Sequence, residues 1–191
     1  MRTTRRPVLG AAAALPLAGC TRQRAMVVGA GVFGAWTAEY LHRAEWDVLL
    51  VDQMGPANAR ASSGGESRMT RGTYGRDEIY TRMALESLDE WKRLSERSAL
   101  PLFHQAGVLF CFQEMIDYAR ESIAVHDRLG LSLQQIDNAT LRERWPQMNF
   151  DGIEFGLFEP EFGALLARRS VEETVARFMA RGGEYLLAHA E

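Results

Sequence analysis

The sequence predicts an α/β fold that opens on a parallel βαβ unit, and three observations support this. A short apolar run, Met26–Val28, is typical of a buried parallel strand. The glycine-rich segment Gly29–Gly34 follows at once, and a helix is expected to begin near Val32. A second apolar run, Asp47–Asp52, predicts the next strand, which ends in a carboxylate.

The three glycines of this turn have different predicted tasks. Gly29 supplies the tight turn, Gly31 lets the backbone approach a pyrophosphate, and Gly34 lets the helix pack against the strand. The positive end of the helix favours the phosphate charge. Asp52 is placed where a carboxylate hydrogen-bonds an unphosphorylated ribose. The pattern indicates a Rossmann-like dinucleotide site, and a purely structural glycine-rich turn is the alternative.

A long segment rich in Gly, Ser and Arg follows, and we expect residues 53–75 to form an ordered loop with a functional role. Residues 78–97 are expected to form a helix because apolar side chains recur at helical spacing. The predicted core-facing stripe consists of Tyr80, Ala84, Leu88 and Trp91.

The remaining elements are predicted from alternation, capping residues and glycines. Two capping boxes, Thr140–Glu143 and Ser170–Glu173, are expected to open helices, the first stopped by Pro146 and the second closed by Gly182 and Gly183. The other expected elements are a strand over 102–112 broken at 105–107, a helix over 114–129 ended by Gly130, and strands over 131–136, 153–158 and 184–189.

Composition narrows the class of protein. The 191 residues are 47% hydrophobic and 25% charged, as in an ordinary globular protein, and the net charge of −3 makes nucleic acid a poor partner. The only cysteines, Cys20 and Cys111, predict neither a disulfide framework nor a metal cluster. The four histidines lack ligand spacing and are interpreted as packed or solvated residues, and no metal site is expected.

Residues 1–20 resemble an export leader and are kept out of the fold. Arg5 and Arg6 resemble a twin-arginine signal, and Leu17–Cys20 resembles a lipobox whose cysteine is acylated. This pattern predicts a protein held at the cell envelope by a lipid on Cys20. The alternative is an extension upstream of the true start, with a cytoplasmic protein.

Taken together, the motifs resemble the N-terminal half of FAD-dependent oxidoreductases of the D-amino-acid oxidase superfamily, nearest to the monomeric sarcosine oxidase and N-methyltryptophan oxidase branch. The resemblance covers nearly all of residues 24–191. Its motifs, in chain order, are VVGAGVFG (27–34), LLVD (49–52), SSGGESR (62–68), MTR (69–71), QAGVLF (105–110), RWP (144–146) and FEPEFGAL (158–165).

The resemblance implies a role for individual residues. Gly29, Gly31 and Gly34 would hold the FAD pyrophosphate, Asp52 the ribose with Gln53 beside it, and Ser62, Ser63 and Ser67 the diphosphate and ribityl chain. Arg68 would lie against the flavin, Arg71 would grip the substrate carboxylate, and Tyr74 is a weaker candidate near the same pocket. The alternative is that the serines cap turns and that the arginines pair with acids such as Glu66 or Asp77.

The resemblance also implies an organisation and an activity. It divides the chain into an FAD-binding region (24–100), part of an α+β substrate domain (101–160) and a return to the FAD-binding domain (161–191), truncated because family members are much longer. The implied reaction oxidises the C–N bond of an amino acid or N-methyl amino acid. A non-catalytic nucleotide-binding remnant and an NAD-dependent dehydrogenase are the alternatives.

This sequence departs from the family pattern in three respects. Gly64 stands where related oxidases often have histidine, and neither Cys111 nor Lys92 matches the family's flavin-linking cysteine or its oxygen-reactive lysine. These departures leave the completeness of the active site open.

Overall fold

The computed structural model describes residues 22–189, which contain five helices and nine strands. The helices are α1 (Val32–Arg43), α2 (Glu78–Glu96), α3 (Asp117–Leu129), α4 (Asn138–Arg144) and α5 (Ala167–Ala180). The strands are β1 (Arg24–Val28), β2 (Asp47–Asp52), β3 (Arg68–Thr70), β4 (Phe103–His104), β5 (Val108–Phe112), β6 (Gln134–Asp137), β7 (Phe155–Glu159), β8 (Gly163–Leu165) and β9 (Glu184–Leu187).

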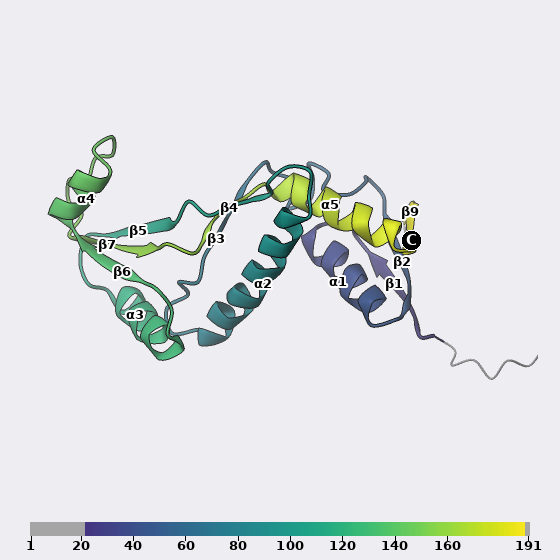
Figure 1. Cartoon of the computed structure of the whole chain (residues 1–191), viewed down its shortest axis with the longest axis horizontal. Helices are drawn as coiled ribbons and strands as arrows, with labels where there is room; N and C mark the ends of the chain where they lie inside the picture. Colours follow the sequence, from purple (N-terminus) through teal and green to yellow (C-terminus); the bar gives the residue numbers. More distant parts are fainter. Residues whose placement is uncertain (1–21, 190–191) are drawn as a thin grey trace, which may run out of the picture.

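The strands form three small sheets that follow one another along an elongated molecule (Figure 1). A parallel sheet of order β1-β2-β9, with α1 and α5, forms one end, which we call the nucleotide lobe. An antiparallel sheet of order β5-β7-β6, with α3 and α4, forms the other end, which we call the distal lobe. The short sheet β3-β8-β4 lies between them beside α2. This mixed architecture confirms the predicted α/β class.

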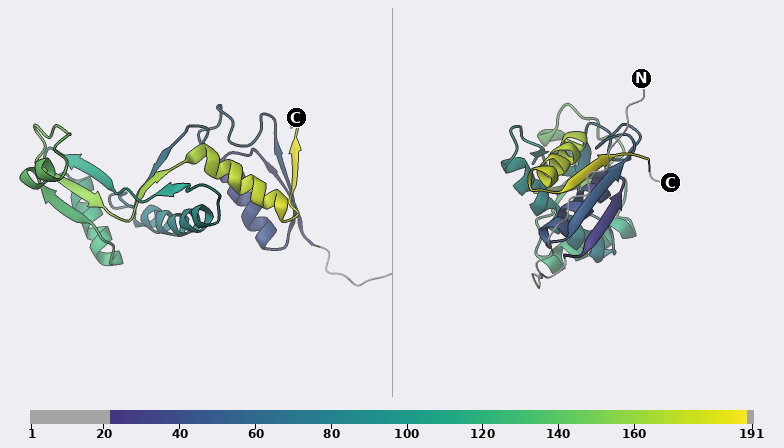
Figure 2. Two further views of the ribbon diagram at one scale, coloured as in Figure 1. Left: turned by 45° about the horizontal axis from the view of Figure 1, so that its top comes forward. Right: turned by 90° about the vertical axis from the view of Figure 1, so that its right-hand side faces the viewer.

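The nucleotide lobe is built from two distant parts of the chain. β2 pairs with β1 on one side and with β9 on the other, and α5 packs against α1 on the same face of the sheet (Figure 2). The buried side chains there are small or aliphatic apart from one phenylalanine: Ala30, Ala35, Ala38, Val48, Leu50, Ala57, Val171, Val175 and Phe178. Alanines on α1 let it approach the sheet closely, which fixes the start of the helix relative to the ends of the strands.

On the opposite face of this parallel sheet the two edge strands are open, whereas Val51 on the central strand is only 4% exposed. Met26 is 65% exposed and Val28 is 64% exposed, and both lie on β1, which forms one edge of the sheet. Leu186 on β9 is half exposed on the same face, because it pairs with Val51, which in turn pairs with Val28. Parallel sheets normally bury both faces, so an apolar surface lies open here.

The distal lobe has a separate core. α3 packs on the β5-β7-β6 sheet through Ala119, Phe155 and Leu157, and α4 contributes Leu141, which packs with Ile136 and Phe150. The chain passes from β4 into this lobe along β5 and leaves it along β7 toward β8 (Figure 1).

Most predicted elements are present with their expected limits. The second strand over Asp47–Asp52, the helix after Gly31, the break between β4 and β5, and the helix stop at Gly130 agree with the sequence expectation. Gly130 has a φ of 67°, in the left-handed region that glycine adopts without strain.

Both capping-box predictions are wrong. α4 begins earlier than Thr140, because the Asp137 side chain is the cap and accepts a 2.8 Å hydrogen bond from the Thr140 backbone N–H. α5 begins directly after β8, so Ser170 lies inside the helix, fully buried, where its hydroxyl donates to the Leu166 carbonyl. Only one residue connects β8 to α5. This short connection determines where the helix begins more strongly than the local capping motif does.

Two further expectations need correction. The predicted loop 53–75 contains the short strand β3, which pairs with Gly163–Leu165, a partner too distant in sequence to be seen as local periodicity. In the predicted core-facing stripe of α2, Leu88 and Trp91 are buried but Tyr80 is 54% exposed, because the first turn of α2 extends past the core. No helix in the described part of the chain combines the length and apolarity that crossing a bilayer requires.

Candidate functional site

The glycine turn between β1 and α1 is tightly packed against β2. Gly29 has a φ of 102°, and its N–H donates to the Val51 carbonyl at 2.7 Å. A Cβ atom at Gly34 would lie 1.7 Å from the Gly29 carbonyl oxygen, so only glycine allows the helix to start this close to the strand. A Cβ at Gly31 would meet its nearest protein atom at 3.5 Å, which is ordinary contact. The protein's own packing therefore does not require glycine at position 31. The backbone there has no side chain over it and can be approached closely by a ligand.

Asp52 fixes both sides of this turn. One carboxylate oxygen, Oδ2, accepts from the Ala30 N–H at 2.8 Å, and the other, Oδ1, accepts from Met54 N–H at 2.7 Å and Gly55 N–H at 2.8 Å. A carboxylate offers about four lone-pair positions, so about one remains for a ribose hydroxyl. Asp52 is only 9% exposed, and the neighbouring Gln53 is exposed. The structure thus adds an anchoring task to the predicted ribose contact, which stays a prediction.

The N-terminal end of α1 is arranged to meet an anion. Ser63 is buried, and its Oγ accepts from the Val32 N–H at 3.1 Å, which brings the distant loop over the helix start. The first turn of α1 carries no acidic side chain, and within residues 22–189 the N–H groups of Phe33 and Gly34 donate no hydrogen bond. Free N–H groups and an uncompensated helix dipole favour a phosphate. The residues present therefore fit a dinucleotide pyrophosphate.

Arg68 forms a second cluster with two of the predicted serines. Its guanidinium donates to the carbonyl oxygen of Ser67 at 2.7 Å and to that of Ser62. These contacts use the serine backbones, so both exposed serine hydroxyls lie outside them. Glu66, the acid that the alternative interpretation assigned to an arginine here, pairs instead with Arg168 at 3.2 Å.

Arg71 lies beyond β3, where the chain crosses toward the distal lobe. Its guanidinium is half-buried and lies 4.8 Å from the centre of the Tyr74 ring, a cation–π contact. No carboxylate within the described residues lies within 4 Å of the guanidinium of Arg71 or of Arg68. A planar fork of donors held by an aromatic ring and lacking a protein partner is suited to bind a carboxylate.

A buried carboxylate, Glu159, holds the segment that follows Arg71. Its Oε1 accepts from the Gly72 N–H at 3.0 Å and from the Thr73 hydroxyl at 2.8 Å, and it lies 3.0 Å from Nε2 of His126. Both Glu159 and His126 are almost completely buried. The backbone next to Arg71 is therefore attached to a buried ion pair.

Both ring nitrogens of His126 face hydrogen-bond acceptors, an arrangement that favours the doubly protonated ring. Its Nδ1 lies 2.8 Å from the Ser122 carbonyl, which can only accept, and its Nε2 faces the Glu159 carboxylate. Burial lowers the pKa of His126, but the hydrogen bonds to Glu159 and to the Ser122 carbonyl outweigh burial and leave the pKa above its usual value. The histidine prediction holds, since His126 is a packed residue, but its charge was not predicted.

The rest of the segment is tied to α3 and α2. The Tyr118 hydroxyl donates to the Thr73 carbonyl at 2.8 Å, and the Gly75 N–H donates to Ser122 Oγ at 3.0 Å. The Thr81 hydroxyl donates to the Gly72 carbonyl at 2.8 Å. Sequence reasoning missed this network because Glu159 is 87 residues from Gly72 and 33 from His126; the only local signal was the FEPEFGAL motif.

Within residues 22–189 the structure thus brings together Gly29, Gly31, Gly34, Asp52 and Ser63, and separately Arg68 with Ser62 and Ser67. Arg71 stands apart, on the segment anchored by Glu159. No group of three or more His, Cys, Asp or Glu side chains in this range could hold a metal ion.

Comparison of the sequence with protein-family models identifies the family of this chain. The model of the DAO family, described as FAD dependent oxidoreductase, matches residues 24–190. The chain belongs to this family. The cofactor of this family of oxidoreductases is FAD, and the glycine turn, the helix start and Asp52 lie inside the matched range.

Individual relatives of this FAD-dependent family match over most of the chain. An N-methyl-L-tryptophan oxidase of Citrobacter koseri is 27% identical over 150 residues, covering 78% of this chain and 40% of the relative. A peroxisomal sarcosine oxidase of Mus musculus is 30% identical over 147 residues, covering 77% of this chain and 37% of the relative. The chain therefore matches well under half the length of these curated relatives, in their N-terminal part.

Solved structures show the same fold. L-Proline dehydrogenase from P. horikoshii superposes with a TM-score of 0.74 at 19% identity, covering 86% of this chain and 43% of that protein. A fructosyl peptide oxidase from Aspergillus nidulans gives a TM-score of 0.73 at 20% identity, with 86% and 40% coverage. The fold of this family member is thus that of part of these larger proteins.

Proposed function

We propose that this chain supplies the FAD-binding cradle and part of the substrate site of an oxidoreductase that oxidises the C–N bond of an amino acid or N-methyl amino acid. The observation that carries the proposal is the presence, within one family match, of an anion-ready helix start and of Arg71, which has no carboxylate partner in residues 22–189. Bound FAD would supply the acceptor for the hydride removed from the substrate.

The chain's own residues would bind the FAD and orient the substrate. The N-terminal end of α1 and the backbone at Gly31 would hold the pyrophosphate, Asp52 the ribose, with Gln53 beside it, and Ser62, Ser63 and Ser67 would border the diphosphate and ribityl chain. Arg68 would place a positive charge beside the flavin, which favours its reduced, anionic form. Arg71 would bind the substrate carboxylate, which fixes the amine carbon relative to the flavin.

A second candidate function is a non-catalytic nucleotide-binding remnant of the family. The observation that favours it is the open apolar surface on the edge strands of the nucleotide lobe. An NAD-dependent dehydrogenase, the third sequence-based interpretation, loses its basis because the family match is to FAD-dependent proteins.

A flavin-binding measurement separates these functions. The purified chain, mixed with FAD, should retain a yellow flavin spectrum after gel filtration and quench flavin fluorescence on titration. Release of peroxide on addition of sarcosine would support the oxidase, and bound flavin without turnover of any N-methyl or primary amino acid would support the remnant.

A matched pair of variants on α1 tests the cradle. Gly34→Ala should abolish FAD binding because its Cβ would collide with the Gly29 carbonyl, whereas Thr37→Ala, at an exposed position on the same helix, should leave binding unchanged. Equal FAD affinity for the two variants would contradict the proposed site.

The cell-envelope location is also a proposal. It rests on the twin-arginine-like and lipobox-like sequence of residues 1–20, which lie outside the described residues. Incorporation of labelled palmitate into the chain, absent from Cys20→Ser and present in Cys111→Ser, would support a lipid anchor. Unlabelled protein in the cytoplasmic fraction would support the alternative.

A further inference from the structure

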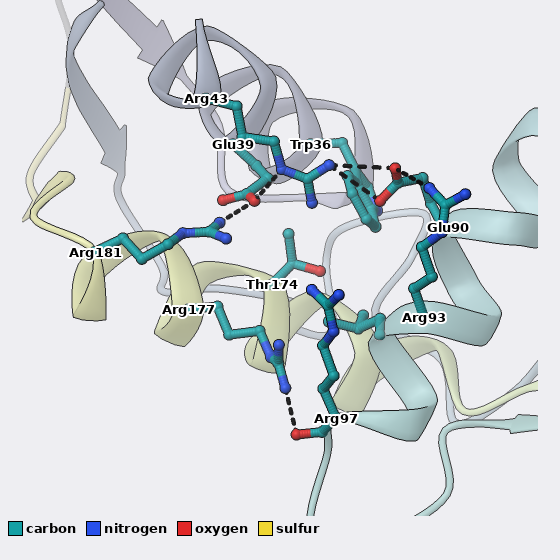
Figure 3. Close-up of a pocket in the computed structure, with 10 residues that line it drawn as sticks. Trp36, Glu39, Arg43, Glu90, Arg93, Arg97, Thr174, Arg177 and Arg181 are labelled. Carbon is teal, nitrogen blue, oxygen red and sulfur yellow. Dashed lines mark hydrogen bonds and ion pairs between the residues drawn. The ribbon is translucent and has the colours of Figure 1, made fainter. Parts of the chain in front are cut away.

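A pocket of about 430 Å³ lies among α1, α2 and α5, away from the glycine turn (Figure 3). Five arginines and two glutamates line it, a formal excess of three positive charges. None of the predicted FAD-site residues line this pocket. We call it the arginine pocket.

The two glutamates are already neutralised by three of the arginines. Glu39 is 2% exposed, and its Oε1 accepts from Nε of Arg43 at 2.6 Å and from Arg181. Glu90 pairs with Arg43 at 3.1 Å and with Arg93 at 3.3 Å. Both carboxylates of the pocket are therefore already paired, and neither is left to balance the charge of a further arginine.

Arg97 is the cation left without a carboxylate. Within the described part of the chain it forms no ion pair, and in Figure 3 its side chain extends toward Thr174 and the centre of the pocket. The neighbouring Arg177 pairs with Glu173 through Nε and directs Nη2 to the Arg97 carbonyl. The guanidinium of Arg97 is thus a set of donors that faces open space.

Two buried polar atoms at the pocket also lack partners. The indole Nε1 of Trp36 is a donor and Oε2 of Glu39 is an acceptor, and neither forms a hydrogen bond with any residue in the range 22–189. Native proteins rarely leave such atoms unsatisfied, and an exception points to a missing water, ion or ligand. A ligand that satisfies both must carry an acceptor and a donor.

We propose that the arginine pocket binds a phosphate monoester that carries free hydroxyl groups, that is, a sugar phosphate or a mononucleotide. The planar guanidinium of Arg97 and the Trp36 indole N–H would bind phosphate oxygens, because arginine matches phosphate in geometry and charge. A ligand hydroxyl would donate to Oε2 of Glu39. The volume lies within the range of small-molecule sites and exceeds what a lone phosphate fills.

Calorimetric titration of the full chain with ribose 5-phosphate at low ionic strength tests the proposal. Arg97→Gln should weaken binding about tenfold or more, because it removes a charged donor to the phosphate. The control is Arg120→Gln on α3, which removes an equally exposed arginine paired with Asp117 far from the pocket and should bind as the parent chain does. Thermal melts followed by circular dichroism should show that both variants are folded.

Three results would overturn the proposal. These are the absence of binding heat, equal affinity of Arg97→Gln and Arg120→Gln, and equal affinity for inorganic phosphate and ribose 5-phosphate, since the last would exclude the hydroxyl contact. A parallel titration with AMP distinguishes the two ligand sources, because tighter binding than ribose 5-phosphate indicates a mononucleotide and equal or weaker binding a sugar phosphate. FAD binding is not a readout here, so failure of this proposal leaves the proposed function untouched.

Discussion

Asp52 in the nucleotide lobe and Glu159 in the distal lobe each hold a loop by accepting backbone N–H groups, but they balance their charge differently. Asp52 uses both oxygens for three backbone donors, lies at the end of a strand and has no charged partner in the described residues. Glu159 uses one oxygen for three donors, one of them Nε2 of His126, while its Oε2 is buried and has no partner among the described residues. A carboxylate at the end of a strand, beside a turn, can rely on backbone dipoles, whereas one in a core needs a countercharge.

Replacing Glu159 should have the largest effect. Glu159→Gln removes the buried countercharge of His126, so below the raised pKa of this histidine a buried cation is left unpaired, and breaking such a pair costs about 3–5 kcal/mol of unfolding free energy. Urea unfolding measures the loss. Glu161→Gln, two residues along the chain and exposed, is the control and should unfold as the parent does. A loss in Glu159→Gln no larger than in this control would remove the distinction between the two carboxylates.

Replacing Asp52 should cost less. Asp52→Ala leaves backbone donors at Ala30, Met54 and Gly55 without acceptors but strands no buried charge, so we expect a loss of about 1–3 kcal/mol. The same urea experiment applies, together with FAD titration. Asp47→Asn, at the exposed start of the same strand, should change neither quantity. A loss as large as that of Glu159→Gln would mean that the countercharge is irrelevant.

The pH dependence of stability should separate the two anchors further. The pKa of His126 is raised in the folded state, so the ion pair stabilises fully below the unfolded value of about 6.5 and this stabilisation is lost as pH rises through the folded pKa. The parent chain should therefore lose unfolding free energy as the pH rises above about 6.5 and through the raised pKa of His126, and His126→Gln should lose less. Parallel slopes in the two proteins would show that His126 is not charged when folded.

The smallest effect on stability is expected at Arg71. Arg71→Lys keeps the positive charge beside Tyr74, so unfolding free energy should change by less than about 1 kcal/mol. The bidentate fork is lost, and affinity of the FAD-loaded protein for a carboxylate ligand should fall about tenfold. Arg76→Lys, an exposed arginine on the same segment, is the control. Unchanged ligand affinity in Arg71→Lys would place the substrate carboxylate elsewhere.

The two carboxylates also show what a sequence can reveal. The place of Asp52 at the end of a strand beside the glycine turn was predictable, because the strand, the turn and the helix are contiguous in the chain, but its anchoring of the turn was not predicted. Glu159 was not predictable, because its partners lie on α3 and on the segment after β3 and meet only when the distal lobe folds. β3 itself escaped prediction for the same reason, since three residues pair with a strand 93 positions away.

The capping boxes failed for a different physical reason. A capping motif is worth about 1 kcal/mol, which is less than the constraint of a one-residue connection or of a better cap such as Asp137. The glycine turn was predicted correctly because a Cβ at Gly34 would lie 1.7 Å from a carbonyl oxygen. No favourable contact elsewhere can compensate for such a clash. Among local signals, steric prohibitions are thus more reliable than weak preferences.

The uncovered face of β1 has a practical consequence for handling this polypeptide. An edge strand with free backbone donors and acceptors, bearing methionine and valine toward solvent, offers a template on which a further strand can add. Solutions of the isolated chain should therefore self-associate as concentration rises, through the lobe that holds the nucleotide cradle. A lysine placed at position 26 would act as a gatekeeper and extend the concentration range in which the chain stays dispersed.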